Sequence, residues 1–183
     1  MAEHWRYLKI LDDDFRNLSR FVEPSKVNLS SYSLELARLL MIAAQECDVL
    51  LQSICVGLGD TKASNEQDYR ATITDKLPSF QSVQVEVDPF GLVFQPFEDW
   101  SKNSTPVWWT ANNKIKHDRV SHFEKASLSN VLLAISGVLV ANLYLHRDGQ
   151  RFSQVVYPLD HFRPLLRVAS ASTLMKRTFE VLD

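Results

Sequence analysis

Residues 31–56 carry the longest helical hydrophobic pattern in the chain, and they constrain its fold more than any other segment. A helix that is apolar on most of its sides must be surrounded by other elements. The segment therefore predicts a long central helix, capped by Ser30 or Ser31 at its start and followed by Gly57 and Gly59 at its end. Its apolar residues recur at helical spacing, at Leu34, Leu36, Leu39, Leu40, Ile42, Ala43, Val49, Leu50, Leu51 and Ile54.

Four other segments carry the periodicity, the capping residues or the flanking prolines of helices. They cover residues 2–21, 66–76, 106–119 and 124–146. Short connections between helices favour an antiparallel, up-and-down arrangement. The chain is therefore expected to be mainly α, an up-and-down bundle of four to five helices.

The hydrophobic period changes from helical to alternating at residues 83–95. Three valines alternate with polar residues, and the turn sequence Asp-Pro-Phe-Gly at 88–91 separates them from a second apolar run. This pattern predicts a small β-hairpin inserted between helices. A further strand-like run occupies residues 152–157.

The composition is that of an ordinary globular chain. Its 183 residues, 45% hydrophobic and 23% charged, suit one domain with a sizeable core. We expect a single domain over residues 1–183, in which residues 149–183 form a less regular C-terminal extension. The formal net charge of −2 gives no global basic excess, so binding of nucleic acid would require a local cationic patch.

The sequence also bears on location. The N-terminal residues lack the apolar core and cleavage site of a secretory signal. Residues 131–145 are apolar but shorter than the ~20 residues that a bilayer requires, so they predict a buried core helix. Cys47 and Cys55 fall in one predicted helix, roughly 12 Å apart, too far for a disulfide. We therefore expect a cytoplasmic protein without membrane association.

The polar run 112–119, which follows two tryptophans on the predicted helix 106–119, is the best candidate for a functional surface. It places two asparagines in a helix interior, where asparagine is unfavourable for helix stability. A helical wheel spreads its members over about half of the helix surface, so they cannot all serve one site. The candidate catalytic residues are Asn113, His117 and Arg119, and the candidate binding residues are Trp109, Asn112, Lys116 and Asp118.

These residue types suit acid–base chemistry on a phosphodiester. Imidazole has an ordinary pKa of about 6.5 and can exchange a proton near neutral pH, which is the role expected of His117. Arg119 or Lys116 would stabilise charge on the phosphate, and Asn113 would orient the scissile group. This chemistry needs no metal or cofactor, and the sequence lacks the spacings of zinc sites and the glycine-rich loops of nucleotide-binding folds.

A structural explanation of the same residues stays open. The tryptophans would pack in the core, the asparagines would bond buried backbone, and the cations would oppose the negative end of the helix dipole. His117 and His122 lie five residues apart, about 140° around a continuous helix, so on such a helix they would not point to one site.

Residues 108–119 read Trp-Trp-Thr-Ala-Asn-Asn-Lys-Ile-Lys-His-Asp-Arg and resemble a motif of uncharacterised bacterial proteins of the HEPN superfamily (higher eukaryotes and prokaryotes nucleotide-binding). Segments 33–35 and 46–50 fit the same resemblance, which covers most of residues 1–147 although its specific part is only the run 108–119. The resemblance implies a small helical bundle that acts as a homodimer. Active members of the family are metal-independent ribonucleases that pair two motifs, each with an arginine separated from a histidine by four to six residues.

On this chain the family histidine corresponds to His117 and the family asparagine to Asn113. Asn112 stands where the family has arginine, and an amide supplies no positive charge to a phosphate. Three functions therefore remain open. The first is a HEPN-like module that binds RNA, nucleotide or a partner protein through the helix carrying residues 112–119.

The second is a metal-independent endoribonuclease of the toxin or defence type that uses His117. The third is a purely structural helical protein. None of the three requires a cofactor. The apolar excess of the predicted helices 31–56 and 124–146 favours a homodimer.

Overall fold

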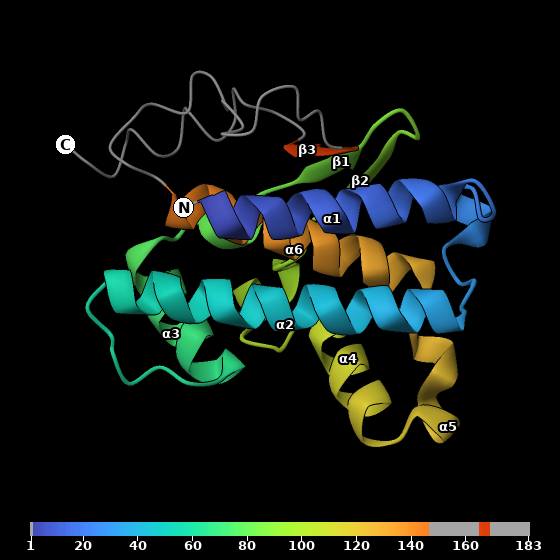
Figure 1. Ribbon diagram of the computed structural model, residues 1–183. Helices are drawn as coiled ribbons and strands as arrows, with labels where there is room; N and C mark the ends of the chain where they lie inside the picture. The colour runs from blue at the N-terminus through green and yellow to red at the C-terminus, as the bar shows by residue number, and fades with distance from the viewer. Residues whose placement is uncertain (1, 147–164, 169–183) are drawn as a thin grey trace.

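The computed structural model describes residues 2–146 and 165–168, and this part of the chain is mainly helical with a small antiparallel sheet (Figure 1). The prediction of a mainly α fold is confirmed. The long helices are α1 (Ala2–Ser19), α2 (Leu34–Gly57) and α6 (Leu128–Leu145). The shorter ones are α3 (Glu66–Lys76), α4 (Val107–His117) and α5 (Arg119–His122), with 3₁₀ turns at Lys26–Asn28, Phe80–Ser82, Glu98–Lys102 and Phe123–Lys125.

α2 and α6 form the most extensive helix pair in the fold. Most residues of α6 are buried, and α2 buries the side that meets α6 and α1. The cap of α2 is Ser33, whose Oγ accepts from the backbone N–H of Leu36 at 3.1 Å, so the prediction of Ser30 or Ser31 is wrong. The later start has a local reason, because a 3₁₀ turn at Lys26–Asn28 and an extended segment precede the helix.

The long helices do not simply alternate in direction. The N–H of Leu128 donates to the carbonyl of Ser31 at 2.9 Å, so α2 and α6 begin at the same end and run parallel. α1 runs opposite to α2, since Arg38 near the start of α2 donates to Asp14 near the end of α1. Residues 58–127 return the chain to the start of α2, which allows α6 to follow the same direction.

α2 and α6 are both long and apolar enough to cross a membrane by length and composition. Within the protein, 56% of the most apolar stretch of α2 and 72% of that of α6 are buried. Helices at the centre of a core have this character too.

α4 approaches α6 closely at Gly137. A Cβ on Gly137 would lie 3.2 Å from Cζ2 of Trp108, 3.4 Å from Sγ of Cys47 and 3.5 Å from Cζ of Phe97. Trp108 is fully buried, as the structural explanation of the tryptophans expects, and its indole N–H donates to the carbonyl of Pro96 at 2.8 Å. The missing side chain at Gly137 thus makes room for the tryptophan that anchors α4.

The predicted hairpin consists of β1 (Val85–Val87) and β2 (Leu92–Phe94), with Val87 opposite Leu92. Gly91 in the turn has a φ of 64°, a conformation that favours glycine. A third strand, β3 (Leu166–Val168), pairs with the other edge of β1 and gives the order β2-β1-β3. This strand was not predicted, and the strand-like run at 152–157 lies outside the described residues.

Leu165 attaches the β3 segment to both the hairpin and α1. Its carbonyl accepts from the N–H of Asp88 at 2.7 Å, and its N–H donates to the carboxylate of Asp12 at 2.7 Å. Asp12 is almost completely buried on α1, and this burial raises the pKa of its carboxyl. Arg16 opposes the rise by donating to the same carboxylate at 2.7 Å.

The close packing at Gly137 is testable by adding a side chain. We expect Gly137→Val to lower the free energy of unfolding by about 1–3 kcal/mol, because its methyl groups would overlap Trp108. Gly57→Ala is the matched control, since no atom lies within 4 Å of a Cβ there. Urea denaturation measures both variants, and equal stability of Gly137→Val and the wild type would contradict the close approach.

Candidate functional site

α4 ends at His117, and a separate short helix, α5, begins two residues later at Arg119. Asp118 lies between them and caps α5, because its carboxylate accepts from the N–H of Ser121 at 3.1 Å. Hydrogen bonds from Ser121 lower the pKa of the Asp118 carboxyl. The prediction of one helix over 106–119 is therefore wrong at its end, since aspartate favours the cap of a new helix over a helix interior.

The break between the helices brings two histidines to one exposed hollow, which we call the α4–α5 hollow. It is shallow and open, has a volume of about 380 Å³, and is lined by Thr105, Thr110, Asn113, Lys114, His117, Asp118 and His122. The expectation that His117 and His122 point apart held only for a continuous helix, and the break at Asp118 removes that condition. One ammonium, two imidazoles, one amide and two hydroxyls face one carboxylate, and this set suits an anionic ligand that accepts hydrogen bonds.

Three of the predicted site residues meet at the hollow, namely Asn113, His117 and Asp118. Arg119 is exposed on α5 and Lys116 is exposed on α4, and neither lines the hollow. Lys116 lies near α2 instead. Burial raises the pKa of Asp48 on α2, and the charge of Lys116 opposes that rise.

The other two predicted residues, Asn112 and Trp109, are half-buried and lie outside the lining of the hollow. The ring of Trp109 meets that of Trp108 edge-on, with 5.4 Å between the ring centroids. Trp109 therefore packs partly on the core. Among the described residues, no hydrogen bond joins the side-chain amide of Asn112 or Asn113 to another group. The side-chain bonds to buried backbone that the structural explanation expects are therefore not found in this part of the chain.

Sequence reasoning missed four residues of the lining: Thr105, Thr110, Lys114 and His122. Thr110, Asn113, Lys114 and His117 are spaced as neighbours on one helix face, so a wheel centred on His117 would have found the first and third. His122 needed recognition of the helix break. The signal for that break was Asp118, because aspartate is favoured at the first capping position of a helix and disfavoured in a helix interior.

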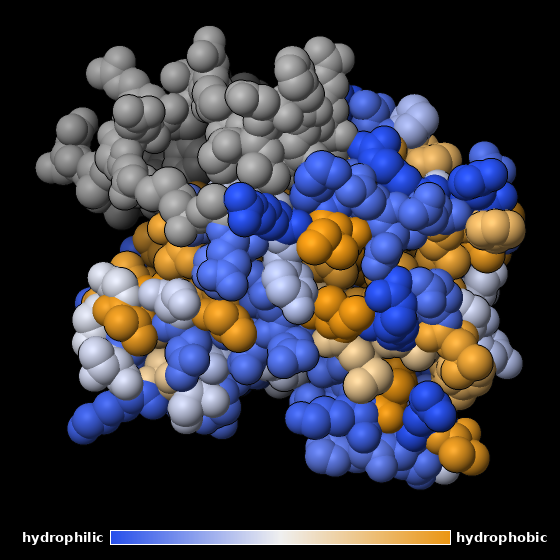
Figure 2. Space-filling model, in the orientation of Figure 1, coloured by the Kyte–Doolittle hydropathy of each residue, from blue (hydrophilic) through white to orange (hydrophobic). Residues whose placement is uncertain are grey.

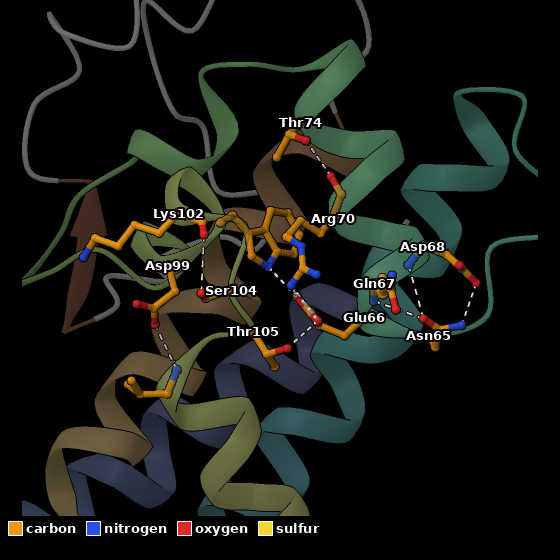
Figure 3. A network of polar contacts seen from close by, with 12 residues as sticks. Asn65, Glu66, Gln67, Asp68, Arg70, Thr74, Asp99, Lys102, Ser104 and Thr105 are labelled. Atoms are coloured by element: carbon orange, nitrogen blue, oxygen red, sulfur yellow. Dashed lines mark hydrogen bonds and ion pairs between the residues drawn. The ribbon is translucent and has the colours of Figure 1, made fainter.

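The buried carboxylate of Glu66 fixes the position of Thr105, one of the residues that line the hollow (Figure 3). Glu66, the first residue of α3, accepts from Arg70 at 2.9 and 3.0 Å, from the indole N–H of Trp100 at 2.8 Å and from Oγ1 of Thr105 at 2.8 Å. Asp99 adds a second tie by accepting from the N–H of Val107, the first residue of α4, at 3.1 Å. The start of α4 is thereby fixed relative to α3.

Residues 2–146 and 165–168 contain no group of three or more His, Cys, Asp or Glu side chains that could hold a metal ion. No family model matches the chain, and neither does any curated protein or solved structure. The resemblance to HEPN proteins stays a prediction, and the function must be argued from the geometry of the hollow.

The Glu66 network is testable by removing its charges one at a time. Glu66→Ala should lower the free energy of unfolding by about 3–5 kcal/mol, because the Arg70 side chain is only 11% exposed and would lose its charge partner. Adding Arg70→Met removes the second charge and should recover part of the loss. Urea denaturation compares the variants, and a double variant less stable than the single one would refute this account of the network.

Proposed function

We propose that this chain is a HEPN-like helical module that binds RNA through the α4–α5 hollow. The observation that carries the proposal is the convergence of Lys114, His117 and His122 on one exposed hollow. Exposed Lys116 and Arg119 lie on the same two helices. Within the hollow, one lysine and two histidines outnumber the single carboxylate of Asp118, on a chain whose net charge is −2.

The shape of the hollow favours RNA over the other ligands considered. Small-molecule sites enclose most of their ligand, whereas this hollow is open and shallow. Protein interfaces depend on buried aromatic and aliphatic anchors, whereas every residue that lines this hollow is of a polar or charged type. An RNA backbone needs exposed cations and hydrogen-bond donors without enclosure.

The lining residues take distinct roles in this proposal. Lys114 contacts a phosphate, and protonated His117 and His122 contact the same or adjacent phosphates. Asn113 and Thr110 hydrogen-bond to sugar or base edges. Asp118 opposes the ligand electrostatically but caps α5, and the cap positions His122.

The proposal extends to the fold. α2 and α6 pack against each other, and α1 and α4 each contact both of them. These four helices would form the core of the bundle of four to five helices expected from the HEPN resemblance. Their connectivity supports a bundle in which α4 presents its C-terminal end to solvent.

Binding of a labelled single-stranded oligoribonucleotide tests the proposal directly. With three phosphate contacts, the logarithm of the affinity should fall with the logarithm of salt concentration with a slope of about −2, and Lys114→Ala should reduce that slope by about 0.7. Lys62→Ala removes another exposed lysine, near α3, and should change neither the affinity nor the slope. Fluorescence anisotropy over a salt series measures each affinity.

Asp118→Asn sharpens the test, because asparagine keeps the helix cap and removes the negative charge. The affinity for RNA should rise in this variant. If Lys114→Ala and Asp118→Asn both bind as the wild type does, or if the wild type binds no RNA, the proposal is refuted.

One observation favours a second candidate, a metal-independent ribonuclease. Two imidazoles at one hollow can act as a general base and a general acid. One takes the proton of the ribose 2′-hydroxyl, whose oxygen attacks phosphorus, and the other protonates the 5′-oxygen as the P–O5′ bond breaks. Lys114 would stabilise the charge on the phosphate in place of the family arginine, which Asn112 replaces.

Cleavage of RNA in EDTA tests this candidate. His117→Ala and His122→Ala should each reduce the rate by about a hundredfold or more, because each removes one of the two proton-transfer groups. Lys62→Ala, purified identically, should cleave at the wild-type rate. Cleavage that is absent, or equal in all four proteins, rejects the ribonuclease candidate and leaves the binding proposal to its own experiment.

A further inference from the structure

One face of α2 is exposed along its whole length, and we call this face the α2 stripe. The apolar positions Leu34, Met41, Val49 and Val56 are 66%, 42%, 42% and 49% exposed. In Figure 2, separate hydrophobic side chains follow the band that α2 occupies in Figure 1, with hydrophilic ones between them. The stripe consists of Leu34, Arg38, Met41, Gln45, Val49, Gln52 and Val56.

The α2 stripe carries almost no net charge. Arg38 is its only charged residue, and the guanidinium is paired with Asp14 on α1 and with Glu35. An exposed helix face in a soluble protein is usually dominated by charged and polar side chains. A row of four exposed apolar side chains along the whole length of one helix face departs from this pattern and suits contact with a partner helix.

The stripe also has the same character in both directions from Gln45. Met41 and Val49 lie four residues to either side, Arg38 and Gln52 lie seven, and Leu34 and Val56 lie eleven. The equal spacing follows from the helical repeat. The helical repeat does not explain why the two residues at each distance from Gln45 are both apolar or both polar.

We propose that the α2 stripe is the interface of a homodimer, in which α2 packs antiparallel against α2 of a second copy about a two-fold axis at Gln45. A two-fold interface requires a surface complementary to itself. In this arrangement Met41 faces the partner's Val49 and Leu34 faces the partner's Val56. Arg38 faces the neutral amide of the partner's Gln52, so no like charges meet.

α1 broadens the proposed interface. The contacts Asp14–Arg38 and His4–Glu46 fix the antiparallel register of α1 on α2, and interpolation between them places Ile10 level with Met41. Ile10 is 57% exposed. Additional apolar area beside the centre of the stripe suits a second copy better than a single narrow helix would.

The dimer is independent of the proposed function. In Figure 1, α1 lies on one side of α2 and α4 with α5 on the other. The two-fold axis lies across α2 in the interface and reverses the direction of α2 without exchanging these sides, so both α4–α5 hollows lie along the same edge of the dimer. The lining of each hollow comes from one chain, so RNA binding does not require the dimer.

Cross-linking at the two-fold axis tests the arrangement. Gln45→Cys places one thiol beside its copy, and a short bifunctional maleimide should convert most of the protein to a covalent dimer. Gln52→Cys is the matched control, because antiparallel packing separates the two copies of residue 52 by roughly 21 Å along the helices. Burial raises the pKa of Cys47 and, to about 11, that of Cys55, so the native thiols react little.

A charge-pair experiment tests the same register without cross-linking. Met41→Glu and Val49→Lys should each weaken the dimer, and Met41→Glu with Val49→Lys should restore it, because each glutamate then faces a lysine of the partner. Met41→Lys with Val49→Lys opposes like charges and should raise the dimer dissociation constant more than about tenfold. Sedimentation equilibrium measures the masses, and circular dichroism verifies that each variant is folded.

The proposal is supported by a wild-type dimer, efficient cross-linking at residue 45 only, and rescue by the opposite charges. A wild-type protein that sediments with the mass of a single chain at tens of micromolar overturns the proposal. It is also overturned if that monomer sediments with phosphatidylserine vesicles, because the stripe would then contact a membrane surface instead of a second copy. A dimer that cross-links equally at residues 45 and 52, or that responds equally to the two double variants, also overturns it.

Discussion

The packing of α6 against α2, with α4 held at Gly137, is the interaction on which the rest of the structure depends. α6 is apolar over most of its surface and is stable only when other elements cover it. Gly137 removes one side chain from that contact, and Trp108 fills the space. Because Trp108 belongs to the first turn of α4, core packing determines where the C-terminal end of α4, and thus the α4–α5 hollow, meets solvent.

Buried carboxylates attach the smaller elements to this helical centre. Glu66 joins α3 to the start of α4 through three donors, and Asp12 joins α1 to the segment that leads into β3. Buried carboxylates are costly unless donors surround them, so each fixes the position of several groups at once. Directional bonds therefore supplement nonpolar packing where short elements bury too little apolar surface to hold their own positions.

The two surfaces proposed to act in recognition differ in chemistry. The α4–α5 hollow is lined by polar and charged residues, among them one lysine and two histidines, and it arises where one helix stops and another begins. The α2 stripe is mostly apolar and arises because α2 is longer and more apolar than its packing against α1 and α6 requires. Their residues belong to different segments, the hollow to residues 105–122 and the stripe to α2, so each surface can be changed by substitution without altering the residues of the other.

The sequence alone determined the mainly α class, the bounds of α3 and the hairpin, because these follow from local periodicity, turn chemistry and hydrophobicity. It also identified Asn113 and His117 as candidate site residues. Only the tertiary structure decided the parallel run of α2 and α6, the pairing of β3 and the meeting of His117 with His122. The first two depend on contacts between distant segments, which periodicity does not encode. The third depends on competition at Asp118 between continuing one helix and capping the next, and that competition is resolved by the position of each helix in the fold.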